Sequence, residues 1–197
     1  MAIGHSTLNV QNFTTSTQAY NTAIGHNAGA AVTTGVNNVL IGGLAGDAQT
    51  TAEGNVAVGY ASLTTAQKSQ LNTALGNLTL QTLNHTTTTN AYNVAVGASA
   101  GRFVTTGVQN TFIGGLAGDA TVDSSDNTAV GYQALSADSG GTSTAVGSAA
   151  LLVATGYDNT ALGFAAGIEI STGNNNTALG HDALRTGSPG GPDYHAI

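Results

Sequence analysis

Few side chains in this sequence could do chemistry, and the histidines are the first to consider. His5 and His26 occupy the same place in two consecutive copies of a short repeat, so their rings are expected to be neighbours. Around a threefold axis, such histidines could form a ring that holds a metal ion or an anion. The alternative is ordinary exposed or hydrogen-bonded histidine, which needs no ligand.

A second candidate is Gly42-Gly43-Leu44-Ala45-Gly46-Asp47, which recurs at 114–119 and superficially suggests a calcium-binding repeat. Such repeats need an oxygen ligand in every turn. Here the Asp returns only at Asp119, several copies of the short repeat later. We therefore favour a turn whose Asp bonds its own backbone. No Lys-Ser/Thr follows, so the segment does not read as a phosphate loop.

The other carboxylates form no arrangement that favours catalysis. Asp123, Asp126, Asp158 and Glu169 lie near expected turns without visible pairing. A glycan-cleaving solenoid, which would carry carboxylates on its coils, stays a minor alternative. Ice binding is a weaker one, because valines interrupt the threonine positions. We expect a non-enzymatic protein without a cofactor or a bound metal.

These residues lie on a repeat that determines the architecture. The pentapeptide Asn-Thr/Val-x-aliphatic-Gly occurs ten times at a nearly constant step, as from Asn38 to Asn55 to Asn72. A fixed period of this length indicates one structural coil per repeat, stacked on the next. We interpret as scaffold the first and last residues of the copies, where Ser143 once replaces Asn: Asn21 and Gly25, Asn38 and Gly42, Asn55 and Gly59, Asn72 and Gly76, Asn93 and Gly97, Asn110 and Gly114, Asn127 and Gly131, Ser143 and Gly147, Asn159 and Gly163, Asn176 and Gly180.

A larger period of four coils lies over the small one, because residues 21–62 align with 93–134. It divides a β-roll domain over 1–185 into units 1–72, 73–143 and 144–185. Thr-rich stretches at Phe13–Thr17 and His85–Thr89 lengthen one coil in each of the first two units, which predicts protruding loops. Residues 186–197 form a turn-rich tail that is expected not to continue the roll. The tail caps the last coil, reaches a partner through Tyr194 and Ile197, or is simply a loose end.

The motif predicts a short strand in each coil. We expect its β-branched and aliphatic residues on a filled inner face, and a second short strand later in the coil. The middle residue, usually Ala, is expected to face a neighbouring chain in a threefold assembly. The fold predicted is an all-β parallel β-roll or β-solenoid of about 11 coils.

Composition excludes several partners. The chain has only three Lys and Arg residues and a net charge of −7, so nucleic-acid binding is not expected. It has no Cys, no apolar run long enough to span a membrane, and no signal peptide. We therefore expect a protein made in a cytoplasm, without membrane insertion.

The copies Asn93-Val94-Ala95-Val96-Gly97 with Ala100, and Asn21-Thr22-Ala23-Ile24-Gly25 with Ala28, resemble the head repeats of YadA-type trimeric autotransporter adhesins. The resemblance implies a left-handed parallel β-roll, three chains side by side, and an adhesive surface. Similar repeats occur in bacteriophage fibre and appendage proteins. The usual step here is longer than the adhesin repeat, and the adhesin's signal peptide, stalk and anchor are missing, which favours a virion component.

Any recognition must come from positions that vary between copies. The residue after the motif Gly varies most, and we name this column the contact stripe, with His5, His26, Tyr60, Asn77, Tyr132, Phe164 and His181 as candidate contact residues. The alternative is aromatic packing at turn edges. The start, Met1-Ala2-Ile3-Gly4, lies inside an eleventh copy and predicts docking of the N-terminal coil onto another virion protein.

The function expected is that of a virion fibre, spike or capsid-decoration adhesin. It would be a homotrimer on the virion surface, made in the host cytoplasm, which attaches to a host glycan or protein or reinforces the particle. The alternative is the head of a trimeric adhesin on a bacterial cell surface.

Overall fold

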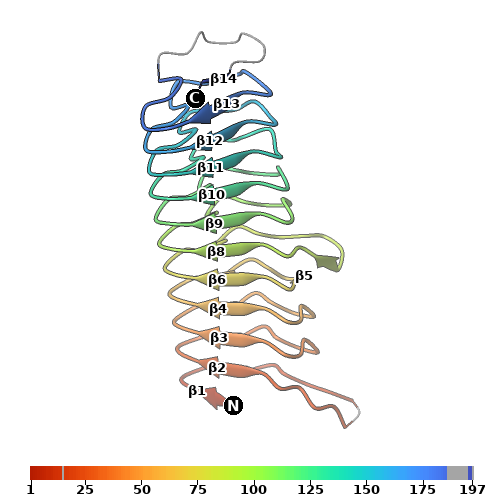
Figure 1. The fold of residues 1–197 in the computed structure, drawn as a ribbon. Coiled ribbons are helices and arrows are strands. Elements are labelled where there is room, and N and C mark those ends of the chain that lie inside the picture. The colour runs from red at the N-terminus through yellow and green to blue at the C-terminus, as the bar shows by residue number, and fades with distance from the viewer. Residues whose placement is uncertain (15, 186–194, 197) are drawn as a thin grey trace.

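The computed structural model describes residues 1–14, 16–185 and 195–196 and arranges them as a stack of parallel coils (Figure 1). Twelve strands, all paired in parallel, form one sheet along the stack. In order these are β1 (Ala2–Ile3), β2 (Thr22–Ile24), β3 (Val39–Ile41), β4 (Val56–Val58), β6 (Thr73–Leu75), β8 (Val94–Val96), β9 (Thr111–Ile113), β10 (Thr128–Val130), β11 (Thr144–Val146), β12 (Thr160–Leu162), β13 (Thr177–Leu179) and β14 (His195–Ala196). The prediction of an all-β parallel solenoid is confirmed.

Each coil contributes one strand to this sheet, and the second strand predicted just after the motif Gly is not present in the described residues. The two extra strands, β5 (Ser69–Gln70) and β7 (Thr89–Asn90), pair only with each other. Elsewhere the chain turns instead. The residues two and four places after the motif Gly have positive φ, as at Leu78 (57°) and Leu80 (46°). This left-handed conformation interrupts an extended segment.

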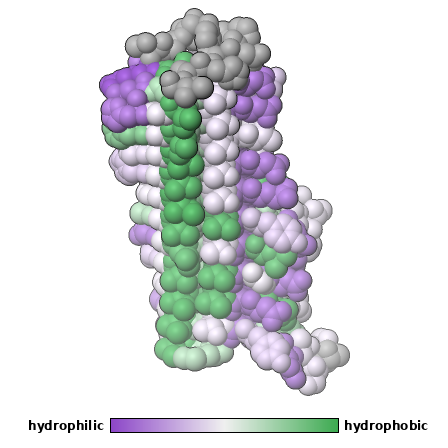
Figure 2. Space-filling view, viewed as in Figure 1, coloured by the Kyte–Doolittle hydropathy of each residue, from purple (hydrophilic) through white to green (hydrophobic). Residues whose placement is uncertain are grey.

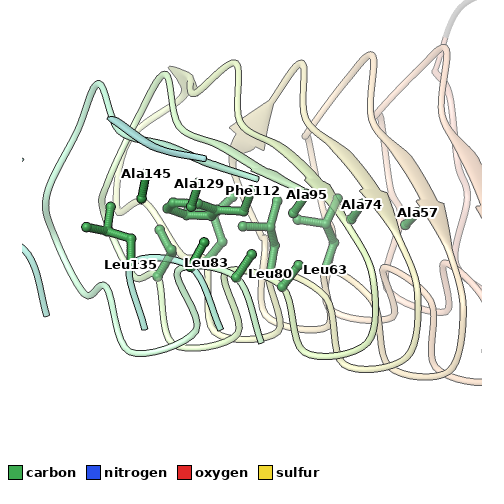
Figure 3. Packing of buried hydrophobic residues seen from close by; sticks show 14 of the residues in the cluster. Ala57, Leu63, Ala74, Leu80, Leu83, Ala95, Phe112, Ala129, Leu135 and Ala145 are labelled. Carbon is green, nitrogen blue, oxygen red and sulfur yellow. The ribbon is translucent and has the colours of Figure 1, made fainter. Parts of the chain in front are cut away.

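The strands face the opposite way from the prediction. Their middle residues, such as Ala57, Ala74 and Ala95, are fully buried in the core of the same chain, so the column of small residues cannot receive a neighbour. The β-branched and aliphatic residues point outward. The physical reason is the limited space inside a coil, because large apolar residues of the returning segments, among them Leu63 and Leu80, already occupy much of it (Figure 3).

In two coils the large core residue lies on the strand and the small one lies on the returning segment. Leu40 and Phe112 replace the strand Ala, and glycine then stands where the opposing leucine would be. A Cβ on Gly118 would lie 2.4 Å from Phe112 Cε1, and one on Gly46 would lie 2.8 Å from Leu40 Cδ2. Leu40 and Phe112 occupy equivalent places in the first two units, so the larger period is also a period of the core.

The motif Asn side chains form a buried ladder along the stack. Asn110 shows the pattern: its Oδ1 accepts from the backbone N–H of Asn127 at 3.0 Å, and its Nδ2 donates to Ser124 O at 3.0 Å. Each side chain thus ties its own coil to the next one. Ser143 has no amide to offer, but its Oγ still accepts from Asn159 N at 3.2 Å.

The motif glycines end the strands because no other residue fits. Gly59 has φ of +136°, and a Cβ there would lie 2.2 Å from the carbonyl oxygen of Gly76 in the next coil. Positive φ and close backbone passage, both proposed from the sequence, therefore apply together.

The structure describes most of the two predicted loops and two residues of the tail. The coils between β1 and β2 and between β6 and β8 project furthest from the stack (Figure 1). Of the tail, residues 186–194 and 197 lie outside the described residues, so the roles predicted for Tyr194 and Ile197 stay predictions. His195–Ala196 pair in parallel with Thr177–Ala178, so the sheet continues into the tail, contrary to prediction.

Candidate interaction surface

The outward residues at the strand ends form one continuous apolar column, which we name the aliphatic stripe. Its exposed fractions reach 50% at Ile3, 48% at Leu162 and 44% at Leu179. The members occupy one place in every coil and are Ile3, Ile24, Ile41, Val58, Leu75, Val96, Ile113, Val130, Val146, Leu162 and Leu179. Figure 2 shows an unbroken green column along the rod, and a contiguous exposed apolar surface of this kind marks an interaction site.

The predicted contact stripe runs beside the aliphatic stripe, two residues further along each coil. Its large members are exposed, with fractions of 55% at Tyr60, 56% at Tyr132 and 52% at Phe164. The Tyr60 ring leans toward the preceding coil, where a Cβ on Gly43 would lie 3.5 Å from Tyr60 Cδ2. Tyr132 repeats this arrangement over Gly115 at 3.6 Å.

Ring stacking links the contact stripe at both ends of the rod. His5 and His26 stack with ring centroids 5.4 Å apart and an interplanar angle of 10°, so the predicted neighbours are in contact. Phe164 and His181 stack at 5.1 Å. Asn77 is exposed between the two ends. A metal or anion on a threefold axis near His5 and His26 stays a prediction.

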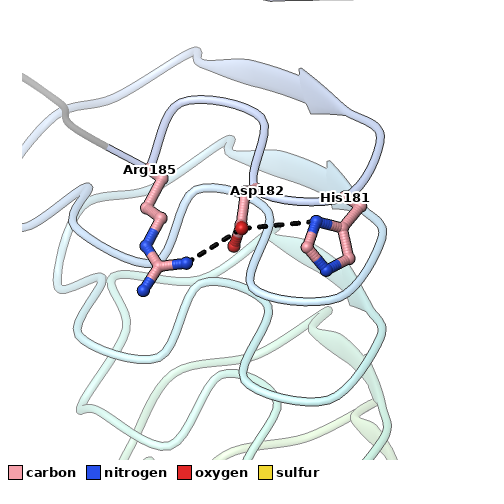
Figure 4. A network of polar contacts seen from close by, with 3 residues as sticks. All are labelled: His181, Asp182 and Arg185. Atoms are coloured by element: carbon pink, nitrogen blue, oxygen red, sulfur yellow. Dashed lines mark hydrogen bonds and ion pairs between the residues drawn. The ribbon is translucent and has the colours of Figure 1, made fainter.

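The last coil carries a small charged network on its surface (Figure 4). Arg185 Nη1 lies 2.8 Å from Asp182 Oδ2, and His181 Nδ1 lies 3.3 Å from the same oxygen. The Arg185 and His181 side chains are 57% and 70% exposed, so water screens these pairs. The network orders the edge of the coil and contributes little to stability.

Asp47 is the acidic residue of the superficially calcium-like segment. Burial raises the pKa of its carboxyl above the ordinary 3.8, and hydrogen bonds from the backbone amides of Ala48 and Asp47 partly oppose this. Its copy Asp119 receives a hydrogen bond from Ser136 Oγ. Asp47 Oδ1 has no hydrogen-bond partner, and Asp119 is bonded to Ser136 of the next coil, not to its own turn. The turn interpretation therefore stays a prediction.

The remaining acidic residues stay dispersed. Asp158 accepts a hydrogen bond from Thr142 Oγ1 at 2.5 Å, while Asp123, Asp126 and Glu169 are exposed. Within residues 1–14, 16–185 and 195–196, no three His, Cys, Asp or Glu side chains are grouped to hold a metal ion. The described part of the chain also has no helix long and apolar enough to cross a membrane.

Comparison of the chain with protein-family models, with curated proteins and with solved structures gives no match. The surface must therefore be interpreted from its own geometry.

Sequence reasoning found the contact stripe and missed the aliphatic stripe, because it placed the aliphatic residues inside the coil. The sequence nevertheless contained a sign of which residues face the core. Leu or Phe at the middle position occurs only where the opposing residue is Gly, at Leu40 with Gly46 and at Phe112 with Gly118. This dependence indicates that the middle position, and not its two neighbours, faces the core.

Proposed function

We propose that the protein is a non-enzymatic structural rod, a left-handed parallel β-roll that assembles as a homotrimer through the aliphatic stripe. The observation that supports this assembly is an aliphatic residue, half-buried or exposed, in every coil along one line of the rod. Removing apolar surface from water stabilises an assembly by about 25 cal/mol per Å². Three such rods side by side would cover their stripes around a common axis.

We propose further that this rod is a fibre, spike or capsid-decoration adhesin on a virion surface. The resemblance of its repeats to those of phage appendage proteins supports this role, and so do the exposed rings of the contact stripe. Its partners would be a second virion protein at the N-terminal coil and a glycan or protein on the host surface. Attachment to the host and reinforcement of the particle both fit a rigid exposed rod.

The second candidate is the head of a trimeric adhesin on a bacterial cell surface. The copy Asn93-Val94-Ala95-Val96-Gly97, with its small residue at Ala100, supports it. Both candidates share the trimeric rod and differ in the particle that carries it.

Two measurements test the proposal. Light scattering coupled to size-exclusion chromatography should give the mass of three chains at micromolar concentration, and a stable monomer would contradict the assembly. Antibody labelling of intact phage particles and of bacterial cells should then place the protein on the particle. Labelling of cells alone would favour the second candidate, and a glycan array would test for sugar binding.

A further inference from the structure

The aliphatic stripe alone is too narrow to hold a stable assembly. Eleven coils spaced about 4.8 Å apart give a length of roughly 50 Å, and the two outward residues of each strand span about 7 Å. The outward face of the strands, which the aliphatic stripe shares with a Thr/Val column, therefore measures roughly 350 Å². A standard interface buries about 800 Å² on each partner. The columns of residues on either side of the strands must therefore contribute the rest of the buried area.

Two columns flank the strands, and both are exposed. One is the contact stripe. The other is the residue immediately before the motif Asn, which we name the leading column, with exposed fractions of 70% at Tyr20 and 53% at Tyr92. Its members have a left-handed backbone, as at Tyr92 (φ 51°) and Gln109 (φ 59°). The motif Asn that follows points inward, so the leading residue stands outside the core.

A closed ring of rods brings these two different columns together. In a cyclic assembly each interface is heterologous, so the contact stripe of one chain faces the leading column of the next. Rotation about an axis parallel to the rod does not change height. Each coil therefore meets the same coil of its neighbour.

In one coil the two columns have clearly complementary sizes. Tyr92 of the leading column, 53% exposed, shares its coil with Ala98 of the contact stripe, whose side chain is a single methyl group. The place over Gly54 is taken by Leu71 of the same chain, because a Cβ on Gly54 would lie 2.6 Å from Leu71 Cδ2. Tyr20 and His26 put two rings at one height, so the size argument applies to the coil of Tyr92.

From this we propose that the leading column and the contact stripe are the two halves of one parallel contact between copies of this chain. Tyr92 would fill the space over the partner's Ala98. The inference rests on the proposed homotrimer and adds which edges meet, and at which height.

Cysteine cross-linking tests the pairing directly, because the chain has no native Cys. The double variant Tyr92→Cys/Ala98→Cys, treated with a short bis-maleimide, should give covalent species that end at three chains. Tyr92→Cys alone and Ala98→Cys alone should remain single chains on a denaturing gel. The matched control is Tyr92→Cys/Phe103→Cys, since Phe103 is 44% exposed but belongs to neither column. It should not cross-link.

The outcomes separate this inference from the proposed function. A scattering mass of three chains without cross-links in the double variant would overturn the edge pairing and leave the trimer intact. Dimers formed by a single variant would indicate a twofold contact and overturn the pairing. A monomer by light scattering would overturn both.

A size exchange provides a second test. Ala98→Tyr places two rings at one height and should raise the midpoint concentration of trimer dissociation at least tenfold. Adding Tyr92→Ala in the same chain should restore the midpoint to within about threefold of the parent. If the double variant were no better than Ala98→Tyr alone, the two residues would not be in contact.

Discussion

At the level of single residues, the coil uses backbone conformations that most side chains avoid. Leu63, Leu80, Leu135 and Leu151 all have φ between 46° and 51°, and their side chains are fully buried in the core. Each such residue costs about 1–2 kcal/mol of backbone strain. Full burial of a leucine contributes about 1.5–3 kcal/mol, which offsets the strain. Residue type alone does not reveal such a conformation, so the sequence could not predict it.

Gln49 is a polar residue in an apolar column. It is fully buried, neither atom of its amide has a hydrogen-bond partner, and the equivalent places in other coils hold Val32, Ala66 and Leu83. Gln49→Met keeps the length of the side chain and removes the unpaired amide. We expect the free energy of unfolding to rise by about 1–3 kcal/mol in urea denaturation. Gln67→Met, at an exposed glutamine outside the leading column and the contact stripe, should change it little, and an equal gain there would contradict the explanation.

Asp47 makes stability depend on pH. Its pKa in the folded chain lies above the ordinary 3.8 because of burial, so the folded state binds the proton more tightly than the unfolded state does. The resulting destabilisation is complete above the raised pKa and disappears as the pH falls below the ordinary value. Asp47→Asn should therefore raise the melting temperature at pH 7 and have almost no effect near pH 3. A gain of equal size at both values would show that the carboxylate charge is not the cause.

At the level of the coil, the sequence predicted the strand, its end at Gly, the parallel stacking and the alignment of copies. It did not predict which side of the strand is buried. In Thr160-Ala161-Leu162 the two larger residues flank a small one, and the usual preference is to bury the larger set. The preference fails here because Leu151 and Ile170 of the returning segments already occupy the interior. Each strand is too short for alternation to reveal this.

Phe112 and Gly118 test how core volume is shared within a coil. Phe112→Ala should cost about 3–5 kcal/mol by leaving a cavity. Adding Gly118→Leu recreates the pairing of Ala129 with Leu135 in the next coil, and the φ of 58° at Gly118 matches the 51° of Leu135. The double variant should recover most of the loss in denaturant unfolding. Gly118→Leu alone should destabilise the chain, because its side chain would clash with the ring.

The Asn ladder offers a matched pair of variants. Asn110→Ala removes the acceptor for Asn127 N and the donor to Ser124 O, so two backbone groups lose their partners. We expect a loss of about 2–4 kcal/mol in the free energy of unfolding. Asn127→Ala should cost less, because the Nδ2 of Asn127 has no partner and only the acceptor for Ser143 N is lost. Equal losses would mean that the donor bonds contribute nothing.

At the level of the whole molecule, every coil touches only its neighbours, so the stack is stabilised by local interfaces added along one direction. The proposed trimer adds a second direction of burial across the aliphatic stripe. Single-chain folding and assembly can therefore be separated by mutations on the outer face.

The variant Leu162→Asp should separate the folding of the single chain from its assembly. Leu162 is 48% exposed in the single chain, so the coil should still form, but three carboxylates would then face one another at the proposed axis. We expect the mass from light scattering to fall from three chains to one, with an unchanged far-ultraviolet circular dichroism spectrum. Val153→Asp is the matched control, because Val153 is 44% exposed outside the stripe and its variant should stay trimeric. Monomers from both variants would contradict the role of the stripe.

The larger, four-coil period also bears on how such a rod changes length. Asn21 and Asn93 occupy equivalent places in the first two units, each of which has its own large core residue, Leu40 or Phe112, and the glycines that make room for it. Homologous recombination between the two copies of the coding sequence would remove or add four whole coils, about 19 Å of rod. In the shortened chain Tyr20 would precede Asn93, where Tyr92 precedes it in the present chain. The strand register, the Asn ladder and the outer columns would therefore all remain continuous. Rod length can thus evolve in steps of one unit without any new packing having to be found.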